Sequence, residues 1–186
     1  MSPNSERERM LAGQYYRAAD AQLTQERERA REITRFLNQT LETDYKERQR
    51  LLGELFGSLG RNVSVEPPFR CDYGNNIYIG SDVFINFDCV ILDVCSVIIG
   101  DYCQIGPGVH IYSATHPLDP EERARGLEYG KPIAIGQNVW IGGRAIINPG
   151  ITIGNNVVIG SGSVLTKDIP NNVLVGGNPA RIIKSL

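Results

Sequence analysis

Residues 135–165 read IGQNVWIGGRAIINPGITIGNNVVIGSGSVL, and this stretch decides the fold. Aliphatic residues stand six apart without a break, at Ile135, Ile141, Ile147, Ile153, Ile159 and Leu165. Glycine follows four of them. Such a fixed period is typical of a solenoid, whose coils cannot bury their apolar sides alone and stack into one continuous core.

The same period continues outside this stretch. Two earlier runs are Ile79, Ile85, Ile91 and Ile99, Ile105, Ile111, with a register slip of two residues between them. The fifth position of the repeat is also expected to point inward and holds small or β-branched residues: Val83, Cys89, Cys95, Val109, Val139, Ala145, Val157 and Ser163. Gly-x-Asn stretches separate the repeats, and both residue types tolerate the left-handed backbone of a sharp corner. Three repeats make a triangular coil of 18 residues, which stacks Ile135 on Ile153, Ile141 on Ile159 and Ile147 on Leu165.

The first 60 residues have a different pattern, with no proline between Ser5 and Glu66. Apolar residues at helical spacing predict a short helix over 5–12, a long helix that Asp20 caps, and a third helix from Thr43 to Phe56. We therefore predict a helical cap over residues 1–60 and a mainly β solenoid, a parallel β-helix, over residues 61–186.

The composition is that of a globular protein, with 41% hydrophobic residues, 22% charged residues and a net charge of -2. This charge gives no general attraction to nucleic acid or to an anionic membrane. No stretch resembles a membrane span or a signal peptide, and the four cysteines form no disulfide framework. We expect a cytoplasmic protein with free thiols, of which Cys89, Cys95 and Cys103 fall at inward positions.

One insertion, residues 113–132, interrupts the repeat and contains His116. A long loop on a rigid solenoid is a common place for function. The residues alone leave a structural role and a general-base role open for this histidine. The only other histidine, His110, belongs to a regular repeat, so we expect it to affect stability more than chemistry.

Several motifs carry a family resemblance over almost the whole chain. They are FRCDYG at 69–74, NFDCVILD at 86–93, PGVHIYSATHP at 107–117, VWIGG at 139–143, PGITIG at 149–154, TKDIP at 166–170 and GGNPAR at 176–181. Together with residues 10–31, they resemble the maltose O-acetyltransferase branch of the hexapeptide-repeat acetyltransferases, relatives of the galactoside and nodulation-factor enzymes.

The resemblance implies a left-handed β-helix, acetyl-CoA as co-substrate, no metal, and a homotrimer with active sites between subunits. Its catalytic residues fall on His116 as general base, Asn86 as an orienting group and the Gly143 amide as oxyanion donor, where relatives commonly have Ser. Sugar hydroxyls would meet Asp72, Asp93 and Glu128. Acetyl-CoA would meet Ser161, Thr166, Lys167, Arg181 and Lys184, the last standing where relatives can have Arg. Trp140 would line the CoA channel or a subunit contact.

Other functions are less consistent with the residues. A carbonic anhydrase of the gamma type needs three histidines on its metal, and the chain has two. A solenoid that only binds partners would leave the loop histidine and the Thr-Lys tail without a purpose. Among acyltransferases, the alternative is a xenobiotic or antibiotic acetyltransferase, against which the helical cap and the Arg-Cys-Asp-Tyr-Gly motif count.

Overall fold

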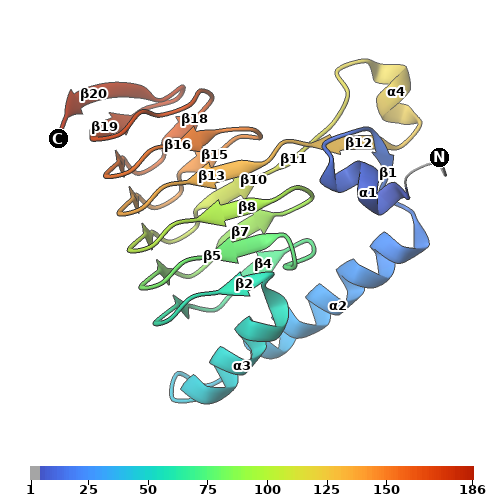
Figure 1. Cartoon of the computed structure of the whole chain (residues 1–186), viewed down its shortest axis with the longest axis horizontal. Coiled ribbons are helices and arrows are strands. Elements are labelled where there is room, and N and C mark those ends of the chain that lie inside the picture. The colour runs from blue at the N-terminus through green and yellow to red at the C-terminus, as the bar shows by residue number, and fades with distance from the viewer. Residues whose placement is uncertain (1–4) are drawn as a thin grey trace.

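A computed structural model describes residues 5–186 as a parallel β-helix with helices at one end (Figure 1). Three sheets of short strands form the sides of a triangular prism, and each turn of the chain adds one strand to every sheet. We name the corners by the sheets they join: the first corner joins the first and second sheets, the second corner joins the second and third, and the third corner joins the third and first.

The strands stack in sequence order within each sheet. The first sheet holds β2 (Ser58–Leu59), β5 (Ile77–Ile79), β8 (Val97–Ile99), β13 (Ile133–Ile135) and β16 (Thr152–Ile153). The second holds β3 (Ser64–Val65), β6 (Phe84–Ile85), β9 (Gln104–Ile105), β14 (Trp140–Ile141), β17 (Val158–Ile159), β19 (Val173–Gly176) and the antiparallel β20 (Arg181–Ser185). The third holds β4 (Phe69–Cys71), β7 (Cys89–Leu92), β10 (His110–Tyr112), β15 (Ile146–Ile147) and β18 (Val164–Leu165).

The predicted stacking of the hexad residues is confirmed. Ile135 pairs in register with Ile153, Ile141 with Ile159 and Ile147 with Leu165, and all six side chains are buried. Every small or β-branched residue predicted to point inward is buried as well. Alternation along each strand therefore turns the two apolar positions of every hexad into the core.

Left-handed backbone at the first corner is confirmed too. Positive φ angles recur there at Asn62, Asp82, Tyr102, Asn138, Asn156 and Asn172. The amide side chains also form a ladder, because Asn138 donates to Asn156 at 3.0 Å and Asn156 donates to Asn172 at 2.9 Å. Asparagine thus tolerates the backbone of the turn and links one coil to the next.

Helices close the N-terminal end of the β-helix. The helices are α1 (Glu6–Leu11), α2 (Ala21–Leu37) and α3 (Tyr45–Leu55), so the third begins two residues later than Thr43, with Asp44 at its N-cap. Asp20 caps α2 by accepting the backbone N–H of Leu23, as predicted. The apolar faces of α2 and α3 join the core of the coils, which shields the first coil from water. No helix in residues 5–186 is long and apolar enough to cross a membrane.

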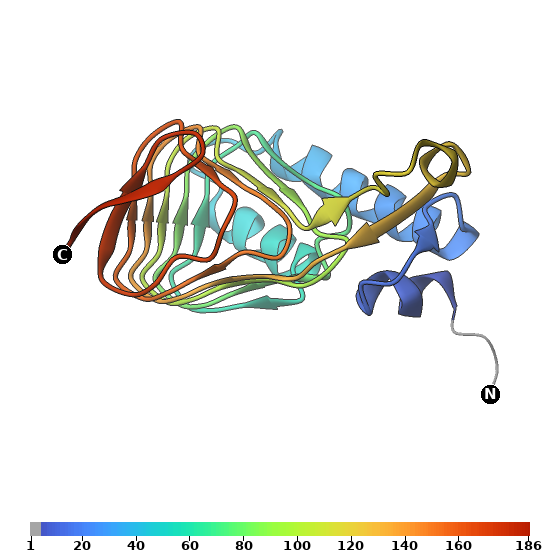
Figure 2. The same ribbon diagram turned by 90° about the horizontal axis from the view of Figure 1, so that it is seen from above.

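Extra residues collect at the third corner. The register slip between Ile91 and Ile99 falls there, because β7 ends at Leu92 and β8 begins at Val97. The insertion leaves the next coil at the same corner and carries β11 (Ala114–Thr115), α4 (Pro120–Ala124) and β12 (Leu127–Gly130). The strand β1 (Tyr16–Arg17) pairs with β12, so the insertion and the N-terminal elements project together from one side of the prism (Figure 2).

Candidate active site

The second corner carries a free backbone donor at Gly143. The turn of each coil stacks on the next there, since Arg144 donates to the Pro107 carbonyl at 2.8 Å and Gly162 donates to the Gly143 carbonyl at 2.9 Å. The equivalent residues of the two coils below are Pro107 and Phe87, and neither offers a free donor. Pro107 has no N–H, and the N–H of Phe87 donates to Oδ1 of Asn86 at 2.8 Å. The N–H of Gly143 meets no acceptor within residues 5–186. It is therefore available to a ligand.

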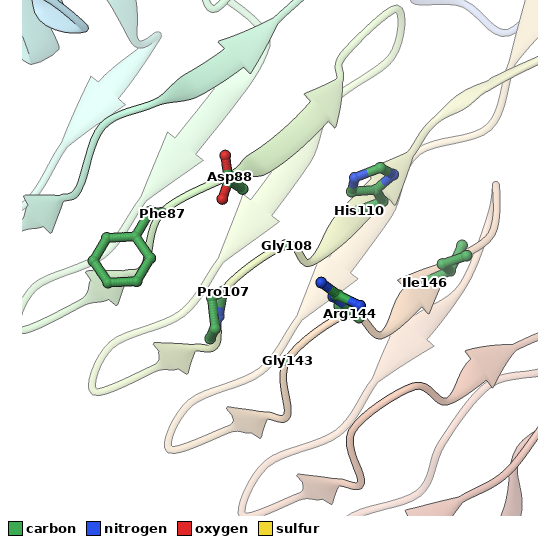
Figure 3. A pocket seen from close by; sticks show the side chains of 8 residues that line it. All are labelled: Phe87, Asp88, Pro107, Gly108, His110, Gly143, Arg144 and Ile146. Atoms are coloured by element: carbon green, nitrogen blue, oxygen red, sulfur yellow. The ribbon is translucent and has the colours of Figure 1, made fainter.

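A cavity of about 820 Å³ opens on this corner and on the outer face of the third sheet (Figure 3). Gly143 lies on its wall, with Arg144 next to it on the same coil and Asp88 two coils below. His110 also lines the cavity, where its Nδ1 contacts the Tyr112 hydroxyl. Our interpretation of His110 as a stability residue therefore needs correction, because its side chain is only half-buried and faces the cavity beside Gly143.

The third corner brings together His116, Glu128 and Asp72. Strand β11 pairs with the antiparallel β12 through Thr115 and Tyr129, so the next residues in that register, His116 and Glu128, come opposite each other. Glu128 lies close enough to Asp72 for their charges to interact. Burial raises the pKa of Asp72, the charge of Glu128 raises it further, and the charges of Arg27 and Arg31 lower it. His116 itself is exposed.

Asp93 does not lie where a sugar ligand would. Its side chain is 0% exposed, so the expectation that it binds a sugar hydroxyl is wrong for this chain. Its Oδ1 accepts the backbone N–H groups of Asp72 at 3.0 Å and Tyr73 at 2.9 Å, and its Oδ2 accepts that of Asn76 at 3.3 Å. Burial raises the pKa of Asp93 to about 7. The carboxyl group therefore fixes the turn that carries Asp72.

A second cavity, of about 570 Å³, lies between α2 and the outer face of the third sheet. Asp72 and Leu92 line it from the sheet, and Arg31 lines it from the helix. The carboxylate of Asp72 thus borders both a cavity and the His116 loop.

The residues expected to meet acetyl-CoA divide between two corners. Ser161 follows β17 at the second corner, and Arg181 pairs with Gly176 on the last strand of the same sheet. Lys184, opposite Leu174, is exposed further along β20. Thr166 and Lys167 follow β18 and lie at the third corner.

Trp140 lies away from both groups. It is 57% exposed on the outer face of the second sheet, between Gln104 and Val158 of the adjacent strands. It lines a cavity of about 430 Å³ with Tyr102 and Leu186. The single chain therefore places it neither beside Gly143 nor beside His116.

One chain does not assemble the whole expected site. Asn86 and Gly143 precede strands of the third sheet, whereas His116 and Thr166 follow strands of that sheet. The width of the sheet separates the oxyanion donor from the loop histidine. The site is therefore present as two halves on neighbouring corners.

The cysteines are unsuited to nucleophilic chemistry. All four are buried and free, as predicted for Cys89, Cys95 and Cys103. Burial raises the pKa of the Cys89 thiol to about 11 and also raises that of the other three. Within residues 5–186, no three His, Cys, Asp or Glu side chains gather as a metal site would require.

Sequence reasoning missed three residues around Glu128. Tyr16 donates to a Glu128 carboxylate oxygen at 2.8 Å, and Arg27 donates to the Tyr73 hydroxyl at 2.8 Å. Tyr16 and Glu128 are 112 residues apart in the chain, and no local pattern signals such a contact.

Comparisons with known proteins concern the chain as a whole and its fold. Residues 9–60 match the model of the maltose acetyltransferase hexapeptide capping motif, and residues 132–167 match that of the bacterial transferase hexapeptide. A maltose O-acetyltransferase from Clostridium difficile 630 is 53% identical, with a TM-score of 0.97 over 98% of each chain. A galactoside acetyltransferase in complex with coenzyme A is 40% identical, with a TM-score of 0.95 over 98% of this chain and 92% of that one. Nodulation protein L of Rhizobium meliloti is 48% identical over 96% of this chain and 97% of its own.

The fold and these matches define the class as the hexapeptide-repeat acyltransferases, with the left-handed parallel β-helix that the resemblance implied. Within that class, the chain belongs to the family of acetyltransferases that carry the maltose acetyltransferase cap.

Proposed function

We propose that the protein transfers an acetyl group from acetyl-CoA to a hydroxyl of a sugar such as maltose or glucose, with His116 as the general base. The observation that carries the proposal is the gathering of His116, Glu128 and Asp72 at one corner. Carboxylates accept hydrogen bonds from sugar hydroxyls, and a neighbouring imidazole can remove the proton of one of them. The similarity of the chain to a maltose O-acetyltransferase and to a galactoside acetyltransferase supports the same reaction.

The chemistry needs one base and one oxyanion donor. His116 takes the proton of the attacking hydroxyl while that oxygen forms a bond to the thioester carbonyl carbon. The Gly143 amide donates to the carbonyl oxygen, which becomes negative in the tetrahedral intermediate. Collapse breaks the carbon–sulfur bond, and His116 returns the proton to the departing thiolate. The products are the sugar acetate ester and free CoA, and no covalent enzyme intermediate forms.

The donor side fits acetyl-CoA. The free N–H of Gly143 stands at the wall of an 820 Å³ cavity, as an oxyanion donor must. Arg181 and Lys184 are exposed on the last strand, where cations can meet the CoA phosphates. Acetyl-CoA from solution supplies the thioester, and these residues would hold and orient it.

A homotrimer completes the site in this proposal. The oxyanion donor lies at the second corner, before the third sheet, and the loop histidine lies at the third corner, after that sheet. Three-fold symmetry around a triangular prism can set the second corner of one subunit beside the third corner of the next. The same packing would unite Ser161 with Thr166 and Lys167 of the adjoining copy.

The acceptor is tested directly with purified protein and a panel of sugars and amines, by measuring CoA release. Sugars should react and amines should not, whereas a xenobiotic or antibiotic acetyltransferase would leave the sugars unreacted. His116→Ala should lower kcat by ~10²- to 10⁴-fold, the usual contribution of a general base. Its affinity for acetyl-CoA, measured by calorimetry, should change little.

His110→Ala is the comparison, because it removes the other imidazole. It should perturb the cavity beside Gly143 and leave proton transfer intact. The assignment of the base is wrong if folded His116→Ala keeps kcat within a few-fold of the parent, or if His110→Ala is the inactive variant.

A further inference from the structure

The side chain of Tyr16 is buried and makes one specific polar contact. It is 1% exposed, and its hydroxyl donates to a carboxylate oxygen of Glu128 at 2.8 Å. A buried hydroxyl bonded to a carboxylate is a strong, charge-assisted interaction. The proposed acceptor carboxylate on the loop is therefore held by a residue of the N-terminal cap.

The position of Tyr16 is fixed by two independent features. Its strand β1 pairs with β12, and Tyr16 stands directly opposite Glu128 in that register. Its ring packs in a small hydrophobic cluster, separate from the core of the coils, with Met10, Leu23, Tyr73 and Val94. The N-terminal elements that carry Met10 and Tyr16 lie beside the insertion, where β1 pairs with β12 (Figure 2). Backbone pairing and packing thus determine where the Tyr16 hydroxyl points.

The orientation of the Glu128 carboxylate matters for acceptor binding because Asp72 is the other proposed acceptor carboxylate at this corner. The charge of Glu128 raises the pKa of Asp72, and in the proposed site both carboxylates meet the acceptor. A glutamate has three side-chain torsions, and restraining them before the ligand arrives lowers the entropic cost of binding. The bond from Tyr16 uses one oxygen of the Glu128 carboxylate and leaves the second oxygen for the acceptor in the proposed site.

We propose that Tyr16 is a positioning residue for the acceptor, acting through Glu128, and that the N-terminal cap is part of the acceptor site. The inference rests on the proposed function, because it assigns Tyr16 to the sugar side of that reaction. Tyr16 does not touch the reacting atoms, and it has no contact with the Gly143 corner where the donor binds.

The test is Tyr16→Phe, which removes the hydroxyl and keeps the ring in its cluster. The KM for the acceptor should rise about two- to tenfold, the range expected when one side chain must be ordered on binding. The kcat and the KM for acetyl-CoA should stay within twofold of the parent, since β1 still pairs with β12. A general loosening of the fold would instead raise both KM values.

Tyr15→Phe is the matched control. It removes a hydroxyl one residue away in the chain, and the ring it keeps packs on Tyr129 with 5.3 Å between centroids. Tyr15 is 44% exposed, and within residues 5–186 the hydrogen bond to Glu128 comes from Tyr16 and not from Tyr15. This variant should leave both KM values unchanged.

A double-mutant cycle isolates the route through Glu128. Glu128→Ala should raise the acceptor KM at least as much as Tyr16→Phe, and adding Tyr16→Phe to it should bring no further rise. Glu128→Ala also decides the matter if Tyr16→Phe does not fold, because an unchanged acceptor KM in that variant overturns the proposal. Additive effects, or a Tyr16→Phe variant that behaves like Tyr15→Phe, overturn it as well.

The two proposals fail differently. A parent protein that acetylates no sugar overturns the proposed function, and the role of Tyr16 falls with it. A parent that acetylates sugars, with equal acceptor KM values for Tyr16→Phe and Tyr15→Phe, overturns only the role of Tyr16.

Discussion

Asp93→Asn should make the stability of the protein less dependent on pH. The two oxygens of Asp93 have unequal surroundings, because two backbone N–H groups reach Oδ1 and one, at 3.3 Å, reaches Oδ2. Oδ2 is therefore the oxygen that can carry a proton. Asn keeps the oxygen that anchors Asp72 and Tyr73 and replaces Oδ2 with a neutral group of similar size.

The magnitude follows from the pKa. Burial raises the pKa of Asp93 to about 7 in the folded protein, whereas an unfolded aspartate has a pKa of about 3.9. Between these values the folded protein keeps a proton that the unfolded chain has released, so stability falls as pH rises. At about 1.4 kcal/mol for each pKa unit, a difference of about three units gives about 4 kcal/mol. The contribution is fully present below pH ~4 and lost above pH ~7.

Urea unfolding of the parent and of Asp93→Asn, at equal protein concentration and several pH values from about 4 to 8, measures this contribution. The difference between them reports mainly on Asp93, with a smaller part from Asp72, whose charge raises the pKa of Asp93. As the pH rises from about 4 to 8, the free energy of unfolding of the variant minus that of the parent should increase by about 4 kcal/mol. A difference that is flat, or that moves the other way, would refute the reasoning.

Two substitutions of Asp93 distinguish its role in anchoring the turn from a role in ligand binding. Asp93→Asn keeps both bonds to the turn that carries Asp72, so its acceptor KM should match that of the parent. Asp93→Ala removes those bonds and leaves buried N–H groups unpaired, at a cost of about 1–3 kcal/mol for each group, and its acceptor KM should rise. Equal rises in the two variants would mean that the charge of Asp93 itself acts on the acceptor.

Two further predictions concern the donor side and the thiols. Lys167→Gln and Arg181→Gln should raise the KM for acetyl-CoA and leave that for the sugar nearly unchanged, with a smaller effect for a donor that lacks the 3′-phosphate; equal losses for both substrates would indicate a folding defect instead. Cys103→Ala should lower the melting temperature, because the thiol fills a buried position, and retain turnover at a permissive temperature. A covalent acetyl-enzyme detected by mass spectrometry would contradict the direct transfer.

The coils could be predicted from the sequence because their determinants are local. A six-residue period determines which side chains point inward, and side-chain volume limits which residues can stack on one another in adjacent coils. The pairing of Ile135 with Ile153 follows directly. The same alternation could have placed His110 correctly. It stands between the inward residues Val109 and Ile111, and the position between two inward residues points outward.

The third corner could not be predicted in the same way. Asp93 looks like a surface carboxylate in the sequence, and only the backbone N–H groups of residues 72–76, brought to it by stacking, explain its burial. The contact of Tyr16 with Glu128 depends on how the cap folds back onto a loop 112 residues later. Such contacts arise from the packing of distant segments, which no period in the sequence encodes.

The position of the candidate chemistry follows from the geometry of the repeat. On the flat sides of the prism, each side chain points either into the core or straight outward from the sheet. Few side chains can therefore converge on one ligand there. Several side chains can converge only where a segment departs from the six-residue period. The extra residues after Cys71, after Leu92 and after Tyr112 all lie at the third corner, one coil above another. The cap folds over that corner, whereas the proposed oxyanion donor, Gly143, stays on the regular second corner. In the proposed reaction, acceptor preference can therefore change through the cap and the insertion while the coils proposed to meet the donor stay fixed.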